Sequence, residues 1–189
     1  MELIAESKLW FMLIVAAMAL QLLALAAISA RNVARQIAKG AVIVDGSGIG
    51  RLNVALRCGW LLAMVVEVDV FQRPFSWPGF AVAAVVTALA FALRAASMWQ
   101  LGVRWSLPTV VMPGAQPESE GIYRYLRHPN WFGVVMEIVS IPMLHGAWLT
   151  ATIFLVLELL LLRHRARVET DALRAAARGA IHSPLRVGV

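Results

Sequence analysis

The residues of this chain best suited to chemistry lie together in the run Arg127-His128-Pro129-Asn130. Proline favours the first position of a helix, so Pro129 predicts a helix start and leaves His128 near its cap. Free backbone N–H groups there, the positive end of the helix dipole and the Arg127 side chain would together form an anion site. We expect such a site to hold a carboxylate or phosphate of a cofactor.

A less specific interpretation of the same region stays open. Tyr123, Tyr125 and Trp131 surround the run. They could form an aromatic belt at a membrane interface while Arg124 and Arg127 contact lipid headgroups.

The connection from Gln100 to Asn130 concentrates most of the remaining polarity and contains four prolines. A connection of that length without helical periodicity is usually functional or disordered. Its dense aromatic residues argue against disorder. We therefore expect an ordered functional loop.

Two glutamates lie inside strongly apolar stretches, where an ionisable group is costly and is read as functional by default. Glu137 is the candidate catalytic carboxylate, whereas Glu158 could pair with the arginines that follow it. Glu67 and Asp69 are expected to be solvated near the outer surface. Arg94 is expected to extend its side chain to the cytoplasmic side.

A cytoplasmic helix is predicted from 163 to 173, in which Arg165 and Glu169 are four residues apart and share one face. One interpretation is a surface salt bridge of little energetic value. The other is a wall of the site beside His128, because a two-residue hairpin at His145-Gly146 would bring the ends of the last two helices side by side.

The glycine-rich segment 41–50 imitates a strand followed by a nucleotide loop. A dinucleotide fingerprint requires a βαβ unit, and here a membrane span follows almost at once. We interpret the segment as a flexible turn, with no Rossmann domain. The single cysteine, Cys58, excludes an intramolecular disulfide and a Cys-based metal site, so no metal is predicted.

The elements that position these residues are membrane helices. The chain has 189 residues, of which 60% are hydrophobic and 15% charged, and its mean hydropathy is +0.74. These values lie outside the range of soluble folds. Apolar stretches predict spans at 9–30, 54–71, 80–98, 129–144 and 147–162. The last two form a tight helical hairpin.

The basic residues predict the orientation. Of 17 Lys and Arg residues, Lys8 and Arg73 alone fall on one side, and the rest fall on the connections and tail of the other. This asymmetry predicts an integral, multi-pass protein with an outside N-terminus and a cytoplasmic C-terminus and active site. The net charge of +6 is attributed to membrane lipids and not to nucleic acid.

We therefore predict an all-α integral membrane protein of about five transmembrane helices plus a cytoplasmic C-terminal helix. It forms a single domain over 1–189: three N-terminal spans over 1–98, then a catalytic loop, the hairpin and the C-terminal helix over 99–178.

The residues resemble those of the isoprenylcysteine carboxyl methyltransferase (ICMT) family and its bacterial members. The resemblance covers about 91–173 in four ordered blocks: Leu101-Gly102-x-Arg104-Trp105, the run from Gly121 to Gly133, Glu137, and Arg165-x-Arg167-x-Glu169-x-x-x-Leu173.

The resemblance implies a multi-span enzyme that uses S-adenosylmethionine without a Rossmann domain. It implies cofactor-binding residues at Tyr123, Tyr125, Leu126, His128, Pro129, Asn130 and Glu169. Arg165 would close the site with Glu169. Arg127, Arg165 or Arg104 could lower the pKa of the methyl acceptor. We take Arg127, Arg165 and Glu137 as the catalytic candidates.

The resemblance also implies a lipophilic acceptor. This is either a prenylated, isoprenylcysteine-like carboxyl group or a hydroxyl of a long-chain polyketide such as an alkylpyrone or alkylresorcinol, and the smaller molecule is favoured. The chain departs from the family at Thr170, where a second glutamate is common, and in its tail. The acceptor and the oligomeric state are not determined by the sequence.

Two alternatives stay open. The first is an NADPH-dependent enzyme similar to sterol reductases, since Arg127 to Gly133 also resembles their Arg-His-x-Asn-aromatic-x-Gly signature. The second is a non-enzymatic lipid-binding or transport bundle. Against it, no pair of broken spans suggests an inverted repeat, and the charges cluster at one face.

Overall fold

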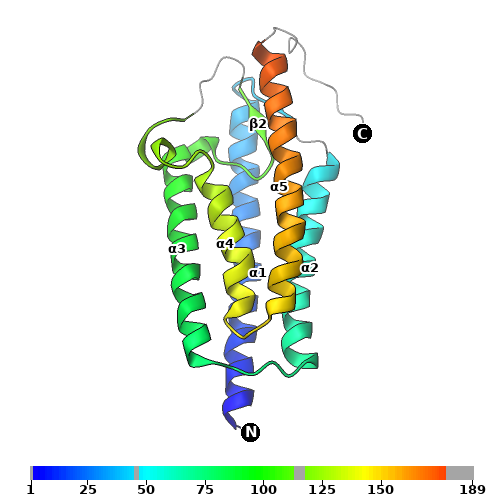
Figure 1. Cartoon of the computed structure of the whole chain (residues 1–189). Helices are drawn as coiled ribbons and strands as arrows, with labels where there is room; N and C mark the ends of the chain where they lie inside the picture. The colour runs from blue at the N-terminus through cyan, green and yellow to red at the C-terminus, as the bar shows by residue number, and fades with distance from the viewer. Residues whose placement is uncertain (1, 45–46, 113–117, 178–189) are drawn as a thin grey trace.

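The computed structural model describes residues 2–44, 47–112 and 118–177, with side chains described over 6–44, 48–112 and 118–168. These residues form five α-helices: α1 (Glu2–Ile37), α2 (Ser47–Val70), α3 (Trp77–Leu101), α4 (Pro129–Met143) and α5 (Trp148–Ala177). The helices run roughly parallel or antiparallel to one another (Figure 1). The N-terminus, the α2–α3 connection and the α4–α5 turn lie at one end, and the other connections lie at the opposite end, called here the loop end.

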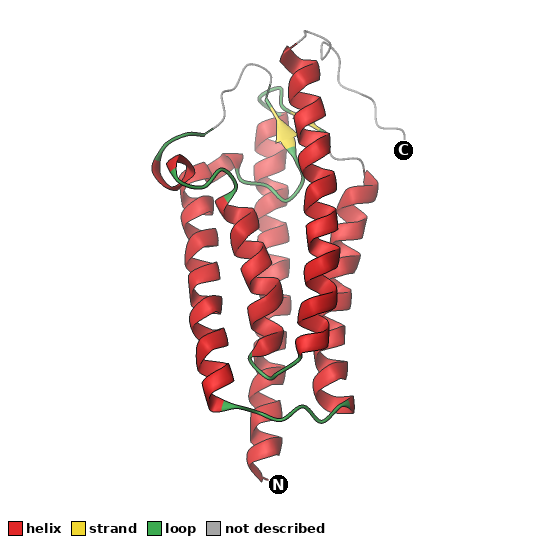
Figure 2. Cartoon of the chain, in the orientation of Figure 1, coloured by secondary structure: helices red, strands yellow, loops and turns green. Residues whose placement is uncertain are grey.

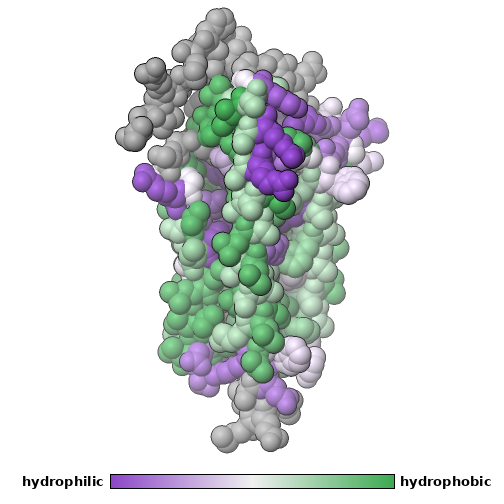
Figure 3. All heavy atoms as spheres, turned by 180° about the vertical axis from the view of Figure 1, so that it is seen from behind, coloured by the Kyte–Doolittle hydropathy of each residue, from purple (hydrophilic) through white to green (hydrophobic). Residues whose placement is uncertain are grey.

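The lengths and composition of the helices fit a membrane bundle. α1, α2 and α3 each contain a segment long and apolar enough to cross a bilayer. Hydrophobic residues cover the length of the visible face, and hydrophilic residues gather toward the two ends (Figure 3). The prediction of an all-α membrane protein with about five helices is confirmed, and no Rossmann domain occurs in the described part of the chain.

The fifth predicted span and the C-terminal helix were expected as two elements, but they form one continuous helix, α5. The apolar run of α5 passes into the charged run after Leu162 without a glycine or proline to end the helix. Because no residue interrupts the helix, Arg165 lies on the same continuous helix as the apolar residues that precede it.

The α4–α5 turn is shaped by one glycine and by a carboxylate from α2. Gly146 has a φ of +71°, a conformation that L side chains rarely adopt. The Glu67 carboxylate accepts hydrogen bonds from the backbone N–H groups of Leu149, at 3.1 Å, and Thr150, at 2.6 Å. It also pairs with Arg73 at 2.9 Å. Our expectation of a solvated Glu67 is therefore wrong: the residue is buried because the first turn of α5 requires hydrogen-bond acceptors.

The core lies between α1, α2 and α4. Trp60 is fully buried, and its indole N–H donates to the Ile138 backbone carbonyl at 3.2 Å. Phe11, Met64 and Ile141 pack in the same cluster. α1 and α2 are thus packed against α4, and α4 begins at the candidate site.

The glycine-rich segment is not simply a flexible turn. Strand β1 (Val42–Ile43) pairs antiparallel with β2 (Val110–Val111), which belongs to the connection between α3 and α4 (Figure 2). Asp45 and Gly46 lie outside the described residues, and α2 begins at Ser47. The first connection therefore contacts the predicted functional loop.

Candidate functional site

The start of α4 has the predicted geometry. Pro129 is its first residue and His128 occupies the cap position. The imidazole of His128 stacks on the indole of Trp131, with ring centroids 4.4 Å apart and planes 12° apart. The His128 side chain does not cap the helix. The cap residue therefore does not satisfy the first-turn N–H groups, which suit water or an anionic ligand.

The segment after α3 is held against α1 by side chains that sequence reasoning missed. The Asn32 amide donates to the backbone carbonyls of Trp105, at 2.9 Å, and Gly102, at 3.3 Å. The Leu107 N–H donates to the Ser29 hydroxyl at 2.9 Å. These bonds fix the 3₁₀ turn η1 (Gly102–Arg104) and the buried Trp105 that follows it.

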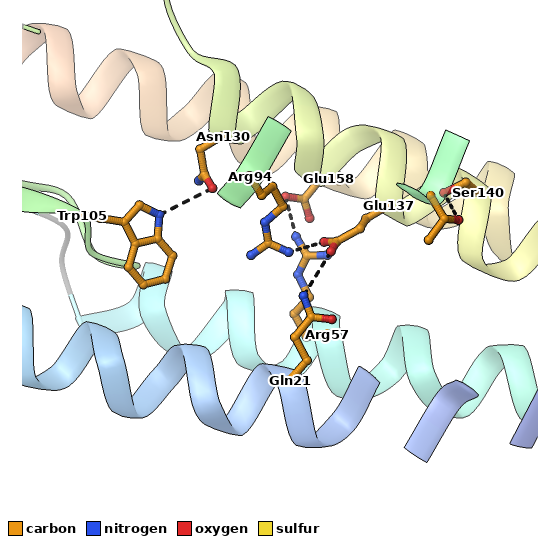
Figure 4. Close-up of polar contacts among 9 residues, drawn as sticks. Gln21, Arg57, Arg94, Trp105, Asn130, Glu137, Ser140 and Glu158 are labelled. Atoms are coloured by element: carbon orange, nitrogen blue, oxygen red, sulfur yellow. Dashed lines mark hydrogen bonds and ion pairs between the residues drawn. The ribbon is translucent and has the colours of Figure 1, made fainter. Parts of the chain in front are cut away.

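Trp105 connects this segment to the start of α4. Its indole N–H points at the Asn130 side-chain oxygen, 3.5 Å away (Figure 4). Asn130 was predicted to bind cofactor, and Trp105 was noted only as part of a family motif. The structure therefore links the predicted site residue Asn130 to Asn32 of α1 through Trp105.

The second 3₁₀ turn, η2 (Gly121–Arg124), is anchored by Gln100. The Gln100 amide oxygen accepts from the Ile122 N–H at 3.1 Å, and its amide nitrogen donates to the Glu120 carbonyl. Gly121 has a φ of +54°, and a Cβ there would lie 2.5 Å from the Gln100 amide oxygen. A glycine is needed because this turn closes directly over the Gln100 side chain.

The predicted aromatic residues of η2 differ in burial. Tyr123 is half-buried, and this burial raises the pKa of its phenol, while the Ser97 side chain acts in the opposite direction. Tyr125 is 82% exposed. Leu126, Arg127 and His128 are also exposed, so they line the outer rim of the loop end.

An ion pair joins two parts of the connection between α3 and α4. The Arg104 guanidinium forms an ion pair with Glu118. Its hydrogen bond lowers the pKa of that carboxyl below the usual range. Arg104, suggested as one of three groups that act on the acceptor, is thus engaged by a loop carboxylate.

Glu137 lies deeper in the bundle. Its carboxylate pairs with the Arg94 guanidinium from α3 and accepts from the Gln21 amide of α1 at 3.4 Å (Figure 4). The expectation that Arg94 extends to the membrane surface is wrong. Arg94 is 6% exposed, because a buried carboxylate offers a closer partner than the lipid headgroups.

Gly133 makes room for that pair. A Cβ at this position would lie 2.6 Å from Arg94 Cγ and 3.0 Å from the Ala90 carbonyl oxygen. The absence of a side chain lets α3 and α4 approach closely, and the stem of Arg94 passes over Gly133 toward Glu137. The motif glycine thus has a packing role.

A further ion pair joins α2 to α5. Arg57 contacts Glu158 at 3.0 Å, and both side chains are largely buried. Glu158 is thus paired, but the expected partner is wrong: its carboxylate contacts Arg57 on the neighbouring helix α2 and not the arginines that follow it. Seven residues further along α5, the Arg165 guanidinium donates to the Leu107 carbonyl. The Glu169 side chain lies outside the described side chains.

The predicted residues therefore occupy two levels. Tyr123, Tyr125, Leu126, Arg127 and His128 lie at the rim. Glu137 follows His128 by nine residues on α4, which corresponds to ~13 Å along the helix axis. Arg165 and Asn130 both contact the 105–107 segment. No group of three metal-ligating side chains occurs within the described ranges.

Comparison with known proteins finds a family model that matches the segment containing these residues. Residues 82–175 match the model of the isoprenylcysteine carboxyl methyltransferase family. The matched range includes the whole of α4 and its connection, with Arg94, Trp105, Glu137 and Arg165.

Two curated relatives extend the similarity beyond that range. Uncharacterized protein YpbQ of Bacillus subtilis is 28% identical over 165 residues, which cover 87% of this chain and 96% of the relative. An uncharacterized protein of Haemophilus influenzae is 26% identical over 150 residues, covering 77% of this chain and 84% of the relative. No solved structure matches. Through residues 82–175, this chain belongs to the isoprenylcysteine carboxyl methyltransferase family.

Proposed function

We propose that this protein is an S-adenosylmethionine-dependent O-methyltransferase that transfers a methyl group to a lipophilic acceptor. Membership of the ICMT family supports a membrane methyltransferase. The observation that supports a cofactor site is the start of α4. There, a helix N-terminus without a side-chain cap lies beside the stacked rings of His128 and Trp131.

These residues fit the cofactor chemically. S-adenosylmethionine presents a carboxylate and a sulfonium, and it supplies an electrophilic methyl group. Free N–H groups at a helix N-terminus suit the carboxylate. Aromatic faces suit the sulfonium. Tyr123, Tyr125, Leu126, His128, Pro129 and Asn130 are the proposed binding residues, together with Glu169.

The proposed contribution of the chain to the reaction is positioning. In an in-line displacement, most of the barrier can be lowered by holding the reacting atoms at ~3–3.5 Å in the right orientation. The hydrogen bonds that Asn32 and Trp105 donate, and the one that Gln100 accepts from the Ile122 N–H, fix the walls of the proposed site before any ligand binds. Arg127 and Arg165 are the groups proposed to attract the acceptor oxygen in its ionised form.

We propose a different role for Glu137. Each of its two carboxylate oxygens has a hydrogen-bond partner, Gln21 on one side and Arg94 on the other. A carboxylate held in this way is poorly placed to accept a proton from a substrate. We assign it to positioning, since it ties α1, α3 and α4 together below the site.

The proposed location of the site is the cytoplasmic side of a bacterial inner membrane. Lys8 belongs to the first turns of α1 and Arg73 to the α2–α3 connection, at the end opposite the loops, whereas Arg104, Arg124 and Arg127 belong to the α3–α4 connection at the loop end (Figure 1). Basic residues favour the cytoplasmic side. The cofactor would enter there, and the lipophilic acceptor, isoprenylcysteine-like or a long-chain polyketide, would come from the bilayer.

Equilibrium binding to the detergent-purified protein tests this proposal. S-adenosylmethionine should bind, and His128→Ala should weaken binding because it removes the stacked ring and changes the cap. His164→Ala, which removes an exposed histidine on α5, serves as the matched control and should bind normally. Binding of NADPH in place of S-adenosylmethionine would overturn the methyltransferase proposal and favour a reductase.

A further inference from the structure

A cleft of about 550 Å³ lies between α1 and α2 toward the loop end, and most of its lining belongs to these two helices, which precede the segment matched by the family model. Small residues of α1, including Ala26, Ala30 and Ala34, form one wall, and Val54 of α2 forms part of the other. Ala26 to Ile37 spans eleven helical steps, or ~16 Å, so the cleft is elongated along the bundle axis.

The surroundings of the cleft are those of a membrane-facing surface. Val54 is 64% exposed and Ile37 is 48% exposed, and both are apolar. They border the cleft on helices that contain membrane-crossing segments. A ligand can therefore approach from the hydrocarbon region without crossing the polar loops.

Three polar side chains, Ser29, Asn53 and Arg165, interrupt the apolar lining. Asn53 has a buried amide oxygen with no hydrogen-bond partner among the described residues. Arg165 of α5 reaches the same cleft, where its guanidinium donates to the Leu107 carbonyl. An unmatched buried acceptor favours a ligand that donates a hydrogen bond, and a guanidinium favours an acidic oxygen.

The cleft adjoins the candidate site through a shared wall. Leu107 and Pro108 line the cleft, and Trp105, two residues before Leu107, contacts Asn130 at the start of α4. Ser29, which also lines the cleft, accepts the Leu107 N–H. A ligand head at Arg165 would lie against the segment that contacts the proposed cofactor residues.

We propose that this cleft binds the acceptor, and that the acceptor is a single-chain amphiphile whose head carries a hydroxyl and an acidic oxygen. The alkyl chain lies between α1 and α2, the hydroxyl donates to the Asn53 amide oxygen, and the acidic oxygen faces Arg165. This inference rests on the proposed methyltransferase function. It assigns binding of the alkyl chain to α1 and α2, which the family model does not cover, and binding of the acidic oxygen to Arg165, which lies within the matched segment.

Binding of a long-chain alkylresorcinol to the detergent-purified full chain tests the proposal. Ala34→Phe fills the cleft and should weaken binding by about tenfold or more, the effect expected when an apolar pocket of this kind is blocked. Ala27→Phe adds the same ring to an exposed position of α1 outside the cleft and should leave binding unchanged. Equal binding by both variants would overturn the proposal.

A second variant tests the proposed contact between Asn53 and the polar head of the ligand. Asn53→Leu should weaken alkylresorcinol binding by about fivefold, the value of one hydrogen bond, and should leave a fatty acid of equal chain length unaffected. Preferential binding of a two-chain phospholipid would contradict a single-chain ligand. S-adenosylmethionine binding is measured on every variant. If it is absent throughout, the proposed function fails, whereas loss of the cleft effects alone refutes only this inference.

Discussion

Gly133 controls how closely α3 and α4 approach at the level of the buried ion pair. Replacing it with alanine places a Cβ against Arg94 Cγ and the Ala90 carbonyl oxygen, and a backbone oxygen cannot move aside cheaply. We expect Gly133→Ala to destabilise the fold by about 1–3 kcal/mol. Thermal unfolding in detergent measures this effect.

Gly48→Ala is the matched control for that substitution. A Cβ at Gly48 meets no heavy atom within 4 Å, and the residue lies in the first turn of α2. Alanine there should be neutral or slightly stabilising. If the two variants unfold at the same temperature, the close approach at Gly133 is incorrect.

The Arg94–Glu137 pair should behave as a coupled unit. Glu137→Gln or Arg94→Met alone leaves a buried charge without its partner, which costs about 3–5 kcal/mol. The double variant should be more stable than the sum of the two losses predicts. A double-mutant cycle by denaturant unfolding measures the coupling. Strict additivity of the two losses would show that the ion pair does not form.

Single residues show where sequence reasoning succeeds and where it ends. Glu137 and Glu158 could be recognised as special because a carboxylate in an apolar helix is costly. Their partners, Arg94 and Arg57, could not, because each lies on another helix and the pairing depends on how the helices pack. Asn32 offered a missed signal, since it continues the buried face of α1 that begins at Phe11.

Glu67 acts at the level of elements, because it joins α2 to the first turn of α5. Glu67→Ala removes two hydrogen bonds to backbone N–H groups and an ion pair with Arg73. We expect a loss of about 2 kcal/mol in the free energy of unfolding. Asp69→Ala is the control: its carboxylate is 67% exposed and pairs only with Lys8 among the described ion pairs, so its effect should be small. Similar losses in both variants would contradict the capping role.

His145 docks α1 against the α4–α5 turn. Its ring contacts Phe11 and Phe75, and its Nε2 lies 3.2 Å from the Ser7 hydroxyl. Burial, assisted by Lys8, lowers the pKa of His145 below its usual 6.5. The unfolded chain therefore binds the proton more readily, and stability falls as the pH drops below about 6.5.

Replacing His145 with phenylalanine should flatten this dependence, because the ring contacts are retained and the titrating group is lost. We expect the unfolding temperature of His145→Phe to change less than that of the wild type between about pH 7 and pH 5. An unchanged slope would show that other groups determine the acid sensitivity.

The elements themselves were predicted unevenly. Long apolar stretches located α1, α2 and α3, and the proline at 129 located the start of α4. The β1–β2 pair was missed because each strand has two residues, too few for a periodic pattern, and because its partners are far apart in the chain. The sequence predicts a boundary after Leu162 because apolar residues give way to charged ones, but this change in composition does not end α5, which continues to Ala177.

At the scale of the whole molecule, the separation of charges determines the expected orientation. Lys8 and Arg73 lie at the end opposite the loops, and the loop end carries the other described basic residues of the connections. The bundle should therefore insert with its N-terminus outside and its loop end in the cytoplasm.

Single-cysteine labelling in intact bacteria tests this orientation. Cys58 is exposed and is first replaced by alanine. Phe71→Cys, in the α2–α3 connection, should then react with a membrane-impermeant maleimide, whereas Lys39→Cys, in the α1–α2 connection, should react only after permeabilisation. Both positions are exposed, so burial cannot explain a difference between them. The reverse labelling pattern would place the candidate site outside the cell, away from cytoplasmic S-adenosylmethionine, and would remove the basis of the proposed function.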